Sequence, residues 1–164
     1  MKTTSENILL LLGQVSDPEI PVLSIIDLGI VRNVIVSDNG EVEVVITPTY
    51  SGCPAMDVIA VEIKMKLLEN GWNKIKITYA LDPAWTTDWM SEEGKEKLKN
   101  YGIAPPQHLS SRIESLLFSE DATVPCPRCK STNTRKISEF GSTACKALYC
   151  CDDCKEPFDY FKCH

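Results

Sequence analysis

The sequence lacks any apolar run near the roughly 18 residues that a membrane-spanning helix needs. It also lacks the basic start and apolar block of a secretory signal, since it opens Met1-Lys2-Thr3-Thr4-Ser5-Glu6. No internal repeat or low-complexity tract is present, and only two histidines occur, His108 and His164. These absences predict a cytoplasmic protein with no membrane partner and few candidates for histidine-based acid–base catalysis.

An excess of positive charge is missing as well. The chain of 164 residues has 17 Lys and Arg against 23 Asp and Glu, a net charge of −6. Residues 1–125 hold 10 basic and 18 acidic residues, a net −8, and residues 126–164 hold 7 and 5, a net +2. Because a nucleic-acid-binding protein normally presents a clearly basic face, no nucleic-acid partner is expected.

Cysteine is abundant, but it is almost confined to the C-terminal tail. Seven of the eight cysteines lie between Cys126 and Cys163, and in a reducing compartment such clustering indicates metal binding rather than disulfides. The pairs Cys126/Cys129 and Cys151/Cys154 are two C-x₂-C motifs separated by 21 residues. Two such turns complete a tetrahedral Cys₄ site, which stabilises a module too small to fold on its own core. Zinc is favoured, with an iron–sulfur cluster as the alternative.

The tail holds further potential ligands. Cys145, Cys163 and His164 could form a second metal site, and the alternative is that they pack around the first. Cys150 directly precedes Cys151, and only Cys151 preserves the C-x₂-C spacing.

Apolar periodicity before the tail predicts an α-β-β-α-β-α order, an α+β class with helices packed on a small open sheet. A capping box at Thr3 and Glu6 starts the first helix, and Asp38-Asn39-Gly40 marks a hairpin with a type I′ turn. A long helix opens at Pro54, with Met56, Ile59, Ala60, Ile63 and Leu67 as its core stripe and Gly71 at its end. We expect a domain at 1–103, a linker at 104–122 and a Cys₄ ribbon at 123–164.

Cys53 is the lone cysteine of the first domain and directly precedes the long helix. The positive end of a helix favours a thiolate there, and Gly52 lets the backbone approach a ligand closely. A buried, inert thiol is the alternative. A catalytic nucleophile needs a base, and with so few histidines a labile metal or cluster ligand fits better. Asp17 and Asp27, the polar residues in apolar surroundings, are expected mainly to cap turns.

Several motifs together resemble the iron–sulfur assembly domain of SufT-like proteins. They are DPEIP at 17–21, DLGIV at 27–31, TPTYSGCP at 47–54 and DPAW at 82–85. The tail, SEFGSTACKAL at 138–148 and EPFDYFKCH at 156–164, is similar to the PaaD-type members of the phenylacetyl-CoA epoxidase system. The resemblance covers nearly the whole chain.

The resemblance implies an accessory protein that matures iron–sulfur or metal centres of the epoxidase and is not itself an enzyme. It implies the oxygenase and reductase subunits and the iron–sulfur assembly machinery as partners. Cys53 would handle a transient cluster in a pocket with Asp17, Asp27, Thr49, Ser51 and Gly52, while the four ribbon cysteines would hold structural Zn²⁺. A non-catalytic docking subunit is the alternative, and a homodimer sharing one cluster between two Cys53 thiols is a further expectation from ligand counting.

Overall fold

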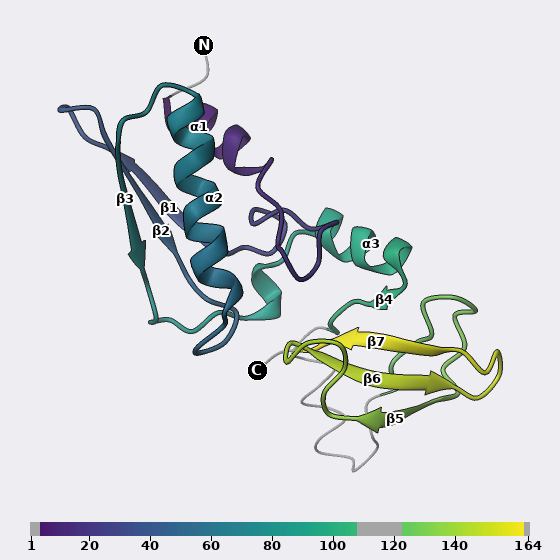
Figure 1. The fold of residues 1–164 in the computed structure, drawn as a ribbon. Helices are drawn as coiled ribbons and strands as arrows, with labels where there is room; N and C mark the ends of the chain where they lie inside the picture. The colour runs from purple at the N-terminus through teal and green to yellow at the C-terminus, as the bar shows by residue number, and fades with distance from the viewer. Residues whose placement is uncertain (1–3, 108–122, 163–164) are drawn as a thin grey trace. The chain divides into compact units, whose positions relative to one another are not determined.

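The computed structural model describes residues 4–107 and 123–162, and the chain divides into two compact units, residues 1–94 and 95–164. Each unit is described by itself (Figure 1). The division falls before the expected domain end at residue 103, within the helix α3 (Glu92–Tyr101). Most of that helix therefore groups with the second unit.

The first unit is a three-stranded sheet with two helices. Its elements, in chain order, are α1 (Thr4–Leu12), β1 (Val31–Val36), β2 (Glu41–Ile46), α2 (Ala55–Glu69), β3 (Lys74–Tyr79) and the short 3₁₀ turn η1 (Thr87–Trp89). The strand order is β1-β2-β3, with β1 antiparallel and β3 parallel to β2. The α+β class is confirmed, and α2 is the crossover that a parallel pair requires. The predicted capping box includes Thr3, which lies outside the described residues.

The core of this unit lies between one face of the sheet and α2 (Figure 1). Val42, Val44 and Ile46 on β2 are fully buried, because alternate residues of a strand point to the same face. The predicted α2 stripe is confirmed at Met56, Ile59, Ile63 and Leu67, which are all buried, while Ala60 is half-buried. α1 adds Ile8 and Leu12 to the buried set and contacts both β1 and α2.

The β1–β2 hairpin forms where expected, but its turn is not type I′. That turn needs positive φ at two central residues, and Gly40 has φ +80° whereas Asn39 does not have a positive φ. The Gly40 N–H donates to the Ser37 carbonyl, and the Asn39 side-chain oxygen accepts from the Glu41 N–H. Asn39 is therefore a side-chain acceptor within the loop, and only Gly40 supplies the left-handed residue.

The end of α2 follows its sequence signal. Gly71, with φ +89°, follows the cap residue Asn70. Its N–H donates to the Leu68 carbonyl, and the Trp72 N–H donates to the Leu67 carbonyl. These two bonds form a Schellman motif, which satisfies carbonyls that the helix end would leave unpaired.

The second unit contains a four-stranded sheet in the order β4-β7-β6-β5. Its strands are β4 (Ile103–Ala104), β5 (Thr134–Ser138), β6 (Lys146–Cys151) and β7 (Pro157–Phe161). Strands β5, β6 and β7 form an antiparallel meander, and β4 joins β7 in parallel. Ala104, assigned to the linker from sequence, is buried and pairs with Tyr160, so the ribbon sheet begins before the expected linker ends. Residues 108–122 of that linker lie outside the described residues.

Candidate metal centre and Cys53 site

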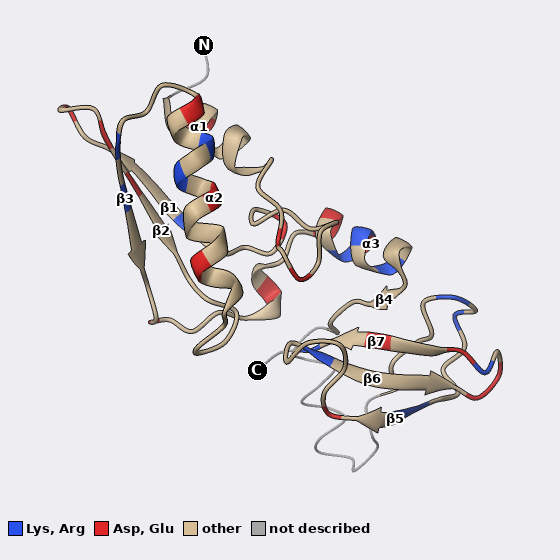
Figure 2. Ribbon diagram, viewed as in Figure 1, with Lys and Arg blue, Asp and Glu red and all other residues tan. Residues whose placement is uncertain are grey.

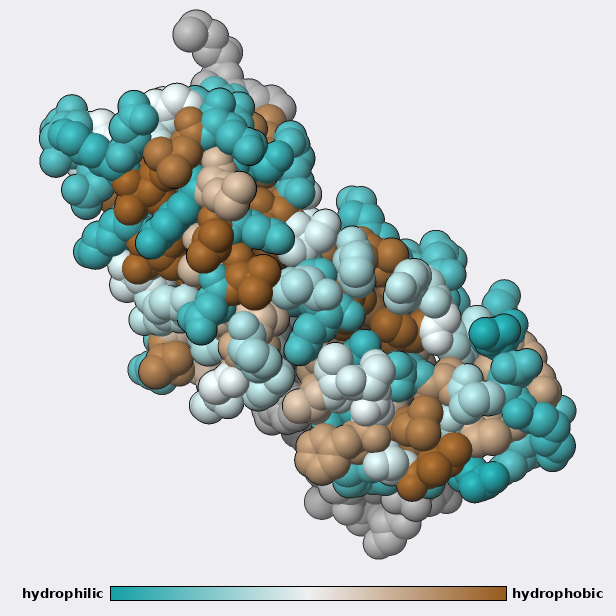
Figure 3. Space-filling model, in the orientation of Figure 1, coloured by the Kyte–Doolittle hydropathy of each residue, from teal (hydrophilic) through white to brown (hydrophobic). Residues whose placement is uncertain are grey.

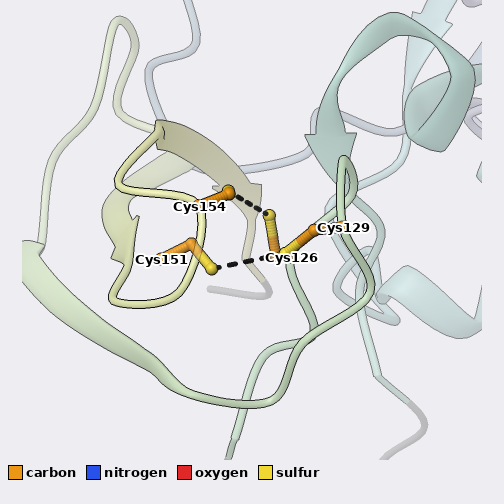
Figure 4. Close-up of side chains that lie close together, drawn as sticks. All are labelled: Cys126, Cys129, Cys151 and Cys154. Atoms are coloured by element: carbon orange, nitrogen blue, oxygen red, sulfur yellow. Dashed lines mark hydrogen bonds between the residues drawn. The ribbon is translucent and has the colours of Figure 1, made fainter.

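The four cysteines of the two C-x₂-C motifs meet at one end of the β5–β7 meander (Figure 4). All four sulfur atoms lie within 4.8 Å of one another, with Cys126 Sγ 3.8 Å from Cys154 Sγ and Cys129 Sγ 3.5 Å from Cys151 Sγ. A tetrahedron with zinc–sulfur bonds of about 2.3 Å has edges of about 3.8 Å. The donor set and its spacing therefore fit a tetrahedral Zn²⁺.

The two motifs share one backbone design. The residue after each second cysteine is left-handed, Lys130 with φ 64° and Lys155 with φ 62°. The N–H of each first cysteine donates to the carbonyl five residues on, from Cys126 to Ser131 at 2.9 Å and from Cys151 to Glu156 at 3.0 Å. Both turns therefore close tightly and place their two sulfurs on one side.

Side chains also tie the two turns together. Asp153, in the second turn, accepts hydrogen bonds from the Ser131 hydroxyl and from Asn133 Nδ2 beside the first turn. These bonds hold the pKa of the Asp153 carboxyl below its usual value, Ser131 being the larger cause. Cys126 and Cys151 lie in the same buried cluster as Ala104, Val124 and Phe158, and Tyr149 and Tyr160 pack against it. The metal site is thus part of the core of its unit.

Simultaneous ionisation of all four thiols is unfavourable when no metal is bound. The Cys154 backbone N–H, followed by the Asp153 N–H, stabilises a thiolate at Cys151 and lowers the pKa of Cys151 to about 7. The Glu156 N–H favours a thiolate at Cys154 too, but burial and the three neighbouring thiols outweigh it and raise the pKa of Cys154 to about 12. A divalent cation removes this conflict, because it neutralises the charge that each thiolate imposes on the others.

The remaining cysteines of the tail lie outside this group of four. Cys150 is half-buried, and its sulfur faces the carbonyls of Cys151 at 3.6 Å and Lys155 at 4.0 Å. The structure therefore gathers Cys151 rather than Cys150 with the other three, as the spacing predicts. Cys145 is buried and lies 3.0 Å from the Thr143 hydroxyl. Because Cys163 and His164 lie outside the described residues, the second metal site stays a prediction.

Cys53 lies in the loop between β2 and α2, one residue before Pro54, the N-cap of α2. It is half-buried and lines a hollow of about 380 Å³. The described residues that share this hollow are Pro48, Gly52, Pro54, Met56, Asp57, Tyr79 and Leu81. Cys53 is thus not fully buried, and the reactivity of its thiol stays a prediction.

The loop residues predicted to support Cys53 have different surroundings. Gly52 has φ +78°, and a Cβ there would meet no atom within 4 Å, so glycine is required by backbone conformation rather than by crowding. It lines the hollow with Cys53. Ser51 is exposed and Thr49 half-buried, and neither is among the described residues that line it.

Asp17 and Asp27 are buried and accept hydrogen bonds within their own turns, and Asp27 also accepts one from the distant Ser91. Asp17 accepts hydrogen bonds of 2.8 Å from the N–H groups of Glu19 and Ile20. Asp27 accepts from the Ser24 N–H and hydroxyl and, at 3.1 Å, from the Ser91 hydroxyl. Neither aspartate is among the described residues that line the Cys53 hollow. These bonds agree with the expected turn-capping role, and a role in the pocket stays a prediction.

Two residues of the hollow escaped sequence reasoning. Asp57 follows Cys53 by four positions and lies in the first turn of α2. Tyr79 ends β3, which lies parallel to the strand that leads into the Cys53 loop. Burial, and then the negative charge of Asp57, raises the pKa of Tyr79. The i, i+4 spacing was the available signal for Asp57. Tyr79 could be found only by aligning the ends of two parallel strands.

Comparison with known proteins assigns a family to each part of the chain. Residues 5–81 match the family described as iron–sulfur cluster assembly protein, and residues 111–162 match the PaaD zinc beta ribbon domain. The fold and the cysteine site thus define an iron–sulfur assembly domain followed by a zinc ribbon.

The chain belongs to the PaaD family of phenylacetyl-CoA epoxidase components. It is 53% identical to an Escherichia coli (strain K12) protein named as a subunit of a "Putative 1,2-phenylacetyl-CoA epoxidase", over 93% of this chain and 89% of that protein. It is 42% identical to a Porphyromonas gingivalis protein named "Fe-S protein maturation auxiliary factor", over 58% of this chain and 90% of that one.

A solved structure supports the fold of the first unit. A domain of unknown function from Bacillus anthracis has a TM-score of 0.54 and 29% identity, covering 57% of this chain and 90% of that one. In the part of the chain that the structure describes, no helix is both long and apolar enough to cross a membrane.

Proposed function

We propose that this protein is an accessory maturation factor that delivers iron–sulfur or metal centres to phenylacetyl-CoA epoxidase and catalyses no reaction of its own. The observation that carries the proposal is Cys53, a partly accessible thiol that lines a hollow at the start of α2. It lies within residues 5–81, which match the iron–sulfur assembly family. Relatives named as maturation auxiliary factors support the same role.

The chemistry of the hollow suits transient binding. A cysteine thiolate is the usual ligand of iron–sulfur clusters, which take four such ligands when stably held. Cys53 is the single cysteine before residue 126, so a cluster bound there keeps positions open for the ligands of a recipient protein. Asp57 and Tyr79 line the same hollow and offer oxygen atoms beside the thiol. The cluster is therefore cargo rather than a resident cofactor.

A catalytic role for Cys53 has less support. Nucleophilic thiols are activated by an adjacent base, most often histidine. The two histidines of the sequence are His108 and His164, far from Cys53 in the chain.

The partners that follow from this function are the oxygenase and reductase subunits of the epoxidase and the iron–sulfur assembly machinery. A homodimer sharing one cluster between two Cys53 thiols stays a prediction, for which sedimentation of the cluster-loaded protein is the test.

The test is Cys53→Ser in the full chain, co-expressed with the epoxidase subunits. We expect normal zinc content and folding, but a reductase subunit purified with little iron and acid-labile sulfide. Cys150→Ser is the matched control, because Cys150 is also half-buried and lies outside the group of four cysteines. A fully loaded reductase from Cys53→Ser cells would overturn the proposal.

A second candidate is a structural subunit that docks the epoxidase components. The name of the Escherichia coli relative, which calls that protein a subunit, favours it. Under this alternative the protein co-purifies with the oxygenase in fixed stoichiometry, and Cys53→Ser leaves epoxidase activity unchanged. The same co-expression therefore separates the two candidates.

A further inference from the structure

Helix α2 is apolar on two opposite faces. Its inner stripe, Met56, Ile59, Ile63 and Leu67, is buried against the first unit. Its outer face carries a second stripe that the sequence analysis did not recognise. The members of this outer stripe and their exposed fractions are Val58 (45%), Val61 (56%), Met65 (55%) and Leu68 (50%). In Figure 3, apolar side chains gather over α2 on the face toward the viewer.

The spacing of the outer stripe matches a helix–helix seam. Its residues follow one another by three, four and three positions, the a/d pattern by which one helix packs into another. At 100° per residue they lie opposite the inner stripe, so the unit's own core leaves them exposed. Large apolar side chains gathered on an exposed surface commonly mark a site of protein–protein contact. The outer stripe therefore has the form of a docking surface for another helix.

The stripe begins at the end of α2 that borders the Cys53 hollow. Asp57, which lines the hollow, directly precedes Val58, the first residue of the stripe. Tyr79 and Leu81 also line the hollow and are among the exposed large hydrophobic residues. A polypeptide that packs along the stripe would thus run toward the thiol.

The charge around the outer stripe indicates the kind of partner that it would bind. The edges of the stripe carry charges of both signs, and Figure 2 shows acidic and basic residues on α2. Exposed Glu62 and Glu69 lie along one side. Exposed Asp57 and Lys64 lie along the other. Residues 1–94 hold 6 Lys and Arg against 14 Asp and Glu, a net −8. A second copy would bring the same net negative charge, whereas a helix with a flank of lysine or arginine would complement the edge formed by Glu62 and Glu69.

We propose that the outer stripe of α2 binds an amphipathic, basic-flanked helix of the protein that receives the metal centre, and holds that protein beside Cys53. The inference rests on the proposed function for the identity of the recipient, the epoxidase reductase subunit. It adds the surface, residues 58–68, and the chemistry of the docking element. Docking and cluster transfer are then separate properties, one of the stripe and one of the thiol.

The test measures binding of the full-length protein to purified, cluster-free reductase subunit by isothermal titration calorimetry. Val61→Glu/Met65→Glu places two carboxylates in the centre of the stripe, and we expect at least about 30-fold weaker binding, as for a disrupted hot spot. Both positions are more than half exposed, so zinc content and thermal unfolding should match the wild type. Ile35→Glu is the control, since Ile35 is also exposed but pairs with Glu43 on the sheet face away from α2. It should change binding less than about 3-fold.

Other outcomes decide against the inference in distinct ways. Wild-type affinity in Val61→Glu/Met65→Glu, or no binding of wild-type protein to the reductase, would overturn it. A wild-type dimer that this variant converts to a monomer in sedimentation would assign the stripe to a second copy instead. Unchanged or tighter binding in Glu62→Lys/Glu69→Lys would refute the basic flanks. Cys53→Ser should bind normally, so loss of maturation in that variant alone tests the proposed function and not the docking surface.

Discussion

Replacing Cys151 with serine should unfold the ribbon sheet while leaving the first unit folded. Cys151 is fully buried, and its sulfur lies 3.5 Å from that of Cys129. Structural zinc contributes about 10–16 kcal/mol to folding in zinc-finger peptides, and an ordinary domain has a total stability of only about 5–15 kcal/mol. Two of the five residues in the buried cluster of the second unit are themselves ligands. Losing one ligand therefore removes both the metal and part of the core.

The assay is hydrogen exchange with mass spectrometry, together with zinc analysis of the purified variant. We expect zinc near zero and loss of protection in β5, β6 and β7. Protection in β2 and α2 should persist, because those elements have their own core, which includes Val44 and Ile63. Thermal unfolding of the wild type with zinc chelated should then show a single transition, that of the first unit, because the ribbon is already unfolded.

Cys150→Ser is the matched control for this experiment. It removes the neighbouring thiol on the same strand without touching the group of four. This control should keep a full equivalent of zinc and normal protection. If Cys151→Ser retained zinc and β6 protection while Cys150→Ser lost them, the ligand assignment and the energetic reasoning built on it would both be wrong.

Two further predictions concern the turn at Asp27 and the protonation of the metal site. Asp27→Ala removes the acceptor of the Ser24 and Ser91 hydrogen bonds and should lower the free energy of unfolding of the first unit by about 1–3 kcal/mol in urea titrations. Full stability combined with failed reductase maturation would instead place Asp27 in the functional site. Because the metal-free pKa of Cys151 is lowered to about 7, this thiol is ionised above that pH and protonated below it. Zinc binding should therefore release one more proton per metal as the pH falls through about 7, and weaken accordingly. Calorimetry in buffers of different ionisation enthalpy measures this release, and a constant value between about pH 6 and 8 would contradict it.

Much of the fold could be predicted from local signals, because they agree with the final packing. The inner stripe of α2 and the alternation of β2 each define one buried face, and Gly71 ends the helix as its position indicates. The hairpin location was equally clear, but the Asn-Gly pair did not specify the turn type. There, the Asn39 side chain accepts a hydrogen bond within the loop instead of the backbone adopting a positive φ.

What sequence reasoning missed depends on contacts between distant segments. Ala104 pairs with Tyr160, 56 positions later. No local pattern in residues 103–104 predicts that strand. The Cys53 hollow likewise includes Tyr79, which reaches it only because β3 is parallel to β2. By contrast, the four ribbon cysteines were evident, because their spacing within each turn follows directly from the geometry of one metal ion.

The outer stripe of α2 shows why a single-period search is insufficient for a helix of this kind. Met56, Ile59, Ile63 and Leu67 already satisfy the expectation of one buried face, so Val58, Val61 and Met65 add nothing to the prediction of a helix. They matter only once the inner face is known to be filled, because burial of one face leaves the other without an intramolecular explanation. One apolar stripe is enough to predict the helix from sequence, so the second stripe is not needed for that prediction. The second becomes informative when the structure shows which side of the helix its own core already covers.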